Sequence, residues 1–406
     1  MTEPNVPRPT AREIAIGMVL DPPDTIARLP DPSSRDPLTA LERAMLPALT
    51  RPPCVVSFSG GLDSSLILAL AVRMARANGL ADPVPVTMRF SDAPAADESD
   101  WQDAVVRALD IAGRWHVVTF DDELDIVGPV AQRVLHRYGV LYPHNLHGSL
   151  PAIDLARGGS VLTGIGGDQM LLGLPRPASH DRRSGALRAL ARLRRLPAAL
   201  RRRMSGGARP GAAAATFEWL RPAVADQARA VWAAARQAEP DRLDQRILWH
   251  LGRRDLRLCL AALGAVGADY DVVMNHPLLD PVFLAALIAR DGYRHRPTRD
   301  ELLSRIVGDT LPAVVTAPRR KAKYHEAYRR RHTRDFLRSW DGTGMDLEFV
   351  DPVALRRIWS RWPVPATSSM LIQHLWLAAH PESSVRRRVP AAIPRPVPPT
   401  GLETSR

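Results

Sequence analysis

The sequence contains little cysteine, with only Cys54 and Cys259 among 406 residues. They form no C-x-x-C pair, so neither a zinc site nor a disulfide framework is indicated. No apolar run approaches the roughly 18 residues that a membrane-spanning helix needs, and the N-terminus lacks the charged and apolar regions of a signal peptide. We therefore expect a cytoplasmic protein without a membrane span.

Negative charge is also scarce, because 55 lysines and arginines face 43 acidic residues and leave a net charge of +12. Nine arginines and no acidic residue lie between Arg182 and Arg203. This stretch is either a basic lid that meets an anionic partner or a solvated insertion. The charge is dispersed along the chain, so it does not require a nucleic acid partner.

Residues 55–65 read Val-Val-Ser-Phe-Ser-Gly-Gly-Leu-Asp-Ser-Ser, a buried-strand pattern that leads into a glycine turn and an apolar helix. Gly60 and Gly61 permit a tight turn, and the free N–H groups of the following helix favour an anion. Asp63 is placed to bind a magnesium ion on that anion. There is no Walker lysine and no G-x-G-x-x-G spacing, so the common nucleotide motifs do not fit.

A second segment, residues 159–168, repeats the order of strand, glycine turn and acid and ends in Asp168. The carboxyl ends of parallel strands meet at one edge of a sheet, so we expect Asp63 and Asp168 to face the same magnesium-triphosphate.

Alternating strand and helix patterns predict a doubly wound parallel sheet in the first half of the chain. We expect a helix over 38–48 and strands at 55–58, 84–90, 114–120 and 160–163. An acidic helix start is expected at 96–101. After about residue 212 the pattern becomes mainly helical, and Asp280 is expected to cap a helix over 283–289.

The two glycine turns together resemble the SGGxDS and G-x-G-[SG]-D loops of the asparagine synthetase-like ATP pyrophosphatases, which include β-lactam synthetases and lasso peptide cyclases. The resemblance covers about residues 38–380. It implies the α/β fold of the PP-loop type and the cofactors ATP and Mg²⁺. It also implies activation of a carboxylate as an acyl-adenylate, release of pyrophosphate and transfer of the acyl group to an amine.

The resemblance assigns ATP contacts to Val56, Ser57, Ser59, Gly60, Gly61, Asp63, Ser64, Ser65, Met88, Gly164, Ile165 and Gly166, and metal binding to Asp63 and Asp168. Lys321 takes the place of the family's catalytic lysine, with Lys323 as the competing choice. A fixed ammonium there stabilises the charge that grows on the α-phosphate in the transition state.

Ile165 departs from the family, which carries a glutamate or tyrosine at that place to deprotonate the amine. Asp271 is our first choice to take the proton, with Asp269 and His276 as alternatives. Two other possibilities stay open: the amine arrives already neutral, or the chain no longer catalyses this step.

The expected organisation is an irregular extension (1–36), a synthetase domain (37–385) and a Pro/Arg-rich tail (386–406). Within the domain we expect a nucleotide core over 50–180, the arginine-rich insertion over 181–211 and a helical part over 212–385. Thr2 stands where glutamine-dependent relatives carry a cysteine, so we expect no amidotransferase activity.

A hydrophobic pocket wall at Ile165 favours a larger substrate than aspartate, such as a peptide carboxylate and amine. A precursor peptide and a protease are then the expected partners. The alternatives are a degenerate nucleotide-binding partner subunit and a PP-loop enzyme that modifies tRNA.

Overall fold

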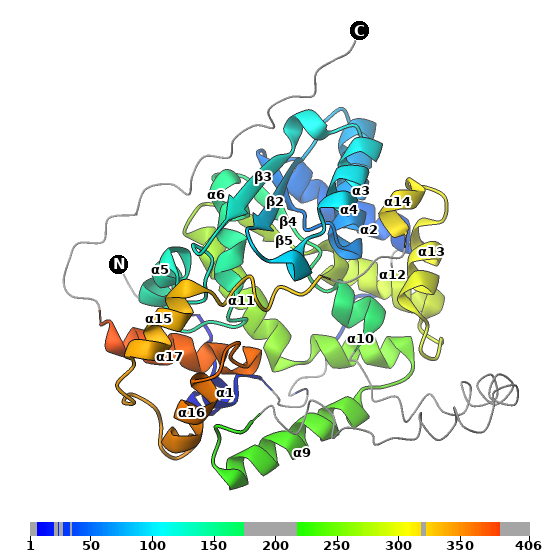
Figure 1. Ribbon diagram of the computed structural model, residues 1–406. Coiled ribbons are helices and arrows are strands. Elements are labelled where there is room, and N and C mark those ends of the chain that lie inside the picture. Colours follow the sequence, from blue (N-terminus) through cyan, green and yellow to red (C-terminus); the bar gives the residue numbers. More distant parts are fainter. Residues whose placement is uncertain are drawn as a thin grey trace, which may run out of the picture.

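A computed structural model describes residues 6–19, 23, 27–32, 35–173, 217–317 and 322–381 (Figure 1). The arginine-rich insertion (181–211), the tail (386–406) and Lys321 lie outside the described residues. None of the helices in the described ranges is long and apolar enough to cross a membrane.

Five parallel strands form the sheet at the centre of the described chain, in the order β3-β2-β1-β4-β5. The strands are β1 (Cys54–Ser57), β2 (Val84–Phe90), β3 (His116–Phe120), β4 (Ser160–Leu162) and β5 (Val273–Asn275). Strand β1 pairs with β2 on one side and with β4 on the other. The chain therefore reverses its direction of winding beside β1, and ligands of such sheets bind at this switch point, outside the carboxyl ends of the strands.

Helices cover both faces of the sheet, which confirms the doubly wound prediction (Figure 1). The helices up to β4 are α1 (Ala11–Ile16), α2 (Pro37–Leu49), α3 (Leu62–Ala77), α4 (Ser99–Ala108), α5 (Pro129–Tyr138) and α6 (Leu150–Leu155). Neighbouring residues of β1 enter different cores, since Val55 packs with α5 and α6 whereas Val56 packs with α2 and α3. A strand buried on both faces reads as a continuous apolar run, as it does here.

The part of the chain over residues 217–381 is mainly helical where the structure describes it, as predicted. Its helices are α9 (Pro222–Ala238), α10 (Leu243–Leu251), α11 (Arg254–Ala268), α12 (Pro281–Asp291), α13 (Arg299–Val307), α14 (Ala313–Thr316), α15 (Arg331–Ser339), α16 (Pro352–Trp359) and α17 (Ser369–Ala379). The Asp280 carboxylate accepts the N–H groups of Val282 and Phe283 at 2.9 Å, which confirms it as the cap of α12.

Two features differ from the sequence-based expectation. Strand β5 was not predicted, because it has three residues at the sheet edge and Val273 is 46% exposed, so it shows no strand pattern. The N-terminal segment is not irregular throughout, because residues 11–16 form α1. Glu13 caps that helix and also pairs with Arg254 at 3.0 Å, which holds the segment against the C-terminal half.

Candidate active site

The first glycine turn is closed by its own serine side chains. The Ser59 and Ser64 hydroxyls lie 3.0 Å apart, Ser59 also accepts the N–H of Gly61 at 3.2 Å, and the Ser65 hydroxyl donates to the carbonyl of Gly60 at 3.3 Å. Gly60 has a φ of +95°, a conformation that favours glycine. The loop thus holds its shape before any ligand binds.

The second glycine turn packs directly on the first. A Cβ atom on Gly164 would lie 2.8 Å from the backbone nitrogen of Ser64 and 3.0 Å from the carbonyl carbon of Asp63. A Cβ atom on Gly167 would overlap the Asp63 carboxyl group. Glycine is needed at 164 because this position lies against the backbone of the first turn, and at 167 because this position lies against the Asp63 carboxyl group. The structure therefore places the predicted nucleotide loops together.

Arg299, at the first position of α13, connects the two acids. Its guanidinium pairs with Asp63 and lies 3.4 Å from Oδ1 of Asp168. The arginine side chain is 13% exposed, compared with 17% for Asp63 and 47% for Asp168. Sequence reasoning missed Arg299; a capping box at Thr298 and Glu301 indicates the helix start but not the ion pairs.

These residues fit magnesium-ATP. Two carboxylates completed by phosphate oxygens and water are a usual environment for Mg²⁺, and both acids already face one cation here. Among the described residues, no group of three or more histidine, cysteine or acidic side chains gathers to hold a metal by itself. The metal would therefore depend on the nucleotide for its remaining ligands.

A segment that follows the predicted lysine loop passes beside the first turn. The Tyr324 hydroxyl donates to the Glu98 carboxylate at 2.8 Å, and Glu98 lies against Gly60 and Gly61. Lys323 is exposed and its N–H donates to the carbonyl of Ala95 at 2.8 Å. Glu98 directly precedes α4, where the acidic helix start was predicted.

The three predicted proton acceptors lie at different ends of the sheet. Asp271 precedes β5 and pairs with Arg51 at 2.8 Å at the amino edge, away from the glycine turns, and Asp269 is bound to Arg137 at 2.9 Å. His276 follows β5 at the carboxyl edge, where its Nδ1 lies 2.7 Å from the hydroxyl of Thr163.

His276 is thus the one of the three that lies beside the second turn, because Thr163 directly precedes Gly164. Burial lowers the pKa of His276 to about 4, so its ring is neutral at pH 7. Ile165 is partly buried against both cores, and its N–H donates to the Thr163 hydroxyl at 3.3 Å.

The remaining predicted nucleotide contacts lie along the central strands. Val56 is fully buried between Pro85 and Leu162 of the adjacent strands, whereas Ser57 and Met88 are partly exposed at the carboxyl half of β1 and β2. Gly166 has a φ of +99° and packs on Leu279.

The asparagine synthase family model matches residues 39–380. The chain belongs to the asparagine synthase family. Membership confirms the resemblance, and the family consists generally of ATP-dependent ligases that form amides. No curated protein matches the chain significantly.

Proposed function

We propose that this asparagine synthase family protein activates a carboxylate with ATP and joins it to an amine of a peptide or peptide-like substrate. The carboxylate oxygen attacks the α-phosphorus, pyrophosphate leaves, and the amine displaces AMP to give an amide. The observation that carries this proposal is the direct packing of the second glycine turn on Asp63, with Asp168 and Asp63 on one guanidinium.

The turn at Ser59–Ser65 is the proposed cradle of the leaving pyrophosphate. Its serine hydroxyls are already hydrogen-bonded within the turn, so the turn becomes ordered when the protein folds. Substrate binding therefore does not carry the entropy cost of ordering it. Magnesium held by Asp63 and Asp168 supplies positive charge to the phosphates when it is bound. Arg299 adds a second cation within reach of the same phosphates.

The proton of the attacking amine is proposed to pass to His276 in place of Asp271. Burial that lowers the pKa of His276 makes it a weak base in the free protein, so this proton transfer requires the negative phosphates of the bound nucleotide to stabilise the imidazolium. Ile165 has no group that accepts a proton. The family's lysine role stays with Lys321, whose segment continues into Lys323 and Tyr324 beside Glu98.

A larger substrate than aspartate is proposed because the wall next to the second turn is the apolar side chain of Ile165, packed on both cores. A precursor peptide as substrate and a protease as partner follow from that choice.

The test uses magnesium-ATP calorimetry and ATP–pyrophosphate exchange with candidate peptides. Asp63→Asn and Asp168→Asn should each weaken magnesium-ATP binding at least about tenfold, since a metal ligand is lost. The matched control is Asp226→Asn on α9, whose side chain is 75% exposed and pairs with Arg229 in a surface ion pair. His276→Gln should retain exchange but lose amide formation. Equal binding in all three aspartate variants would contradict the proposal.

A further inference from the structure

A cavity of about 450 Å³ lies beside the N-terminus of α15 and has no part in the proposed chemistry. Four arginines line it, Arg329, Arg330, Arg331 and Arg334, together with Trp362. We call it the arginine cavity.

Arg329 is buried in the wall of the arginine cavity, with 6% of its surface exposed. Within the described part of the chain, its Nε and Nη1 have no hydrogen-bond partner. Burial lowers the pKa of Arg329 although Asp125 and Glu326 oppose this shift. A buried guanidinium with unsatisfied N–H groups is unfavourable until an anion binds it.

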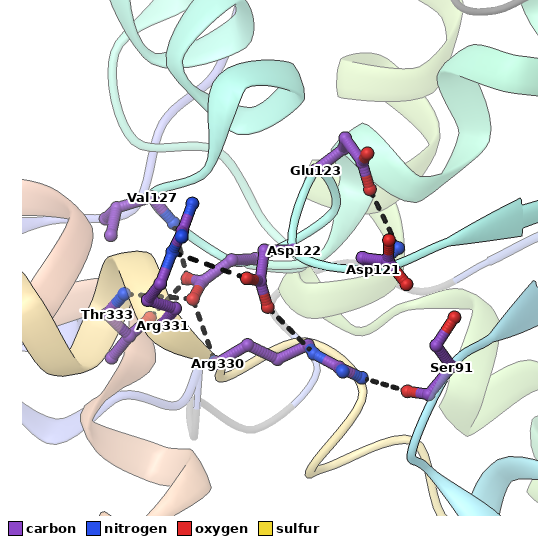
Figure 2. Close-up of polar contacts among 9 residues, drawn as sticks. Ser91, Asp121, Asp122, Glu123, Val127, Arg330, Arg331 and Thr333 are labelled. Carbon is purple, nitrogen blue, oxygen red and sulfur yellow. Dashed lines mark hydrogen bonds and ion pairs between the residues drawn. The ribbon is translucent and has the colours of Figure 1, made fainter.

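The turn that carries Arg329 is held rigidly by acidic side chains (Figure 2). The Arg330 guanidinium donates to Asp122 at 3.1 Å and to the carbonyl of Ser91 at 2.6 Å. The Asp125 carboxylate accepts the N–H groups of Arg330 and Thr333 at 2.8 and 2.9 Å. These contacts of Arg330 hold the turn in place, so the backbone position of Arg329 is fixed before a ligand binds.

The other two arginines can be reached by a ligand from the solvent side. The Arg331 side chain is 68% exposed, and its Nε lies 3.5 Å from Oδ2 of Asp122, which is longer than a normal hydrogen bond. The Arg334 guanidinium lies over the ring of Trp362, 4.5 Å from its centroid. The cavity thus offers one buried and two accessible cations.

A second hollow of about 550 Å³ continues from the arginine cavity, because both are lined by Arg334 and Trp362. It adds Arg338, Arg356 and Arg361 and the aromatic rings of Trp340 and Trp359. An extended ligand with alternating acidic and apolar groups fits such a lining better than a single small ion does.

The arginine cavity is connected to the nucleotide site by a short segment. Tyr324, which donates to Glu98 beside the first glycine turn, lies four residues before Tyr328, and both rings pack on Phe90. Arg329 follows directly. One short segment therefore contacts Glu98 beside the first glycine turn at Tyr324 and lines the arginine cavity at Arg329.

We propose that the arginine cavity and the hollow beside it bind an acidic segment of the peptide substrate, with one carboxylate on Arg329. The inference rests on the proposed ligase function, which supplies a peptide substrate. Three acidic residues also line the cavity, Asp92, Asp122 and Glu326. They repel the densely spaced phosphates of a nucleic acid more strongly than the fewer, spaced carboxylates of a peptide.

Fluorescence anisotropy without ATP tests this with a labelled octapeptide of alternating glutamate and leucine, compared with its glutamine-leucine counterpart. The wild-type chain should bind the acidic peptide at least about tenfold more tightly. Arg329→Gln should lose about the same factor and Arg331→Gln about threefold, with affinity falling as salt rises. Arg107→Gln, an exposed arginine of α4, is the control and should bind normally.

Arg331 is exposed, so its variant keeps the test decisive if Arg329→Gln fails to fold. Equal affinity for the two peptides, or normal binding by Arg331→Gln and Arg329→Gln, would overturn the proposal. So would displacement of the peptide by an oligouridylate or by inorganic phosphate at a lower concentration than unlabelled peptide. The anisotropy assay contains no ATP, so it measures peptide binding independently of the ligase reaction. If the chain binds the acidic peptide but shows no ATP–pyrophosphate exchange with candidate peptides, the ligase function is refuted and the peptide site stands.

Discussion

Substitution of Gly167 by alanine tests whether contact between the two glycine turns controls nucleotide binding. The new Cβ would lie closer than 3.0 Å to Cγ and to both carboxylate oxygens of Asp63. Ordinary contacts begin at about 3.4 Å, so the carboxylate must move by about 1 Å or rotate away. Either movement removes Asp63 from Arg299 and from its proposed place at the metal.

We expect magnesium-ATP affinity to fall at least about tenfold, and adenylation about a hundredfold, since a misplacement of about 1 Å commonly costs that much. The overpacking should lower the free energy of unfolding by only about 1–3 kcal/mol, so the variant stays folded. Calorimetry measures the affinity and a thermal melt followed by circular dichroism checks the fold.

Gly264→Ala is the matched control. Gly264 is exposed within α11, and nothing lies within 4 Å of a Cβ added there. It should bind normally and gain up to about 1 kcal/mol of stability, because alanine favours a helix. A folded Gly167→Ala protein with the affinity of Gly264→Ala would refute the argument that the turns control the site.

Two further predictions concern charge. Lys321→Met should bind ATP normally but form amide about a hundredfold to a thousandfold more slowly, whereas Lys323→Met should lose far less activity. Single-turnover amide formation measures the difference. A larger loss in Lys323→Met would assign the catalytic role to Lys323 instead. His147 is 2% exposed, and burial lowers its pKa to about 4, so below pH 6.5 the unfolded chain gains a proton that the folded chain does not. The free energy of unfolding should therefore decrease as the pH is lowered, by about 1.4 kcal/mol per pH unit between pH 6.5 and 4.5 for this residue. Urea unfolding of His147→Gln should show a slope smaller by that amount, and an unchanged slope would mean that His147 is charged in the folded protein.

The central fold and the two glycine turns could be predicted because their signals are local. Strand β2 matches the prediction at both ends, since its alternating apolar residues end at Phe90, where the turn begins. Helix α2 begins at Pro37, behind a cap at Asp36, within a residue of the expected start. In each case the residues that determine the element lie within it or next to it.

The rest of the site depends on contacts that sequence spacing does not show. Arg299 lies 131 positions after Asp168, and no motif joins them. Asp271 was the first choice for the proton acceptor, yet its φ of +56° places it in the turn before β5, which then runs to His276 at the opposite edge. Without β5 the direction of the chain there could not be inferred.

Arg299 resolves an electrostatic problem that the predicted metal site creates. Two carboxylates that converge on one point repel each other, and the close packing of Gly164 and Gly167 on Asp63 limits the movement of its side chain. The guanidinium neutralises both acids while α13 positions it through the Thr298 capping box. A cation at a helix N-terminus is disfavoured by the helix dipole, so the acids, and not the helix, hold Arg299 there. Magnesium alone would compete with this arginine, whereas magnesium-ATP brings phosphates that can accept the displaced guanidinium. We therefore expect the proposed site to bind magnesium-ATP in preference to free magnesium.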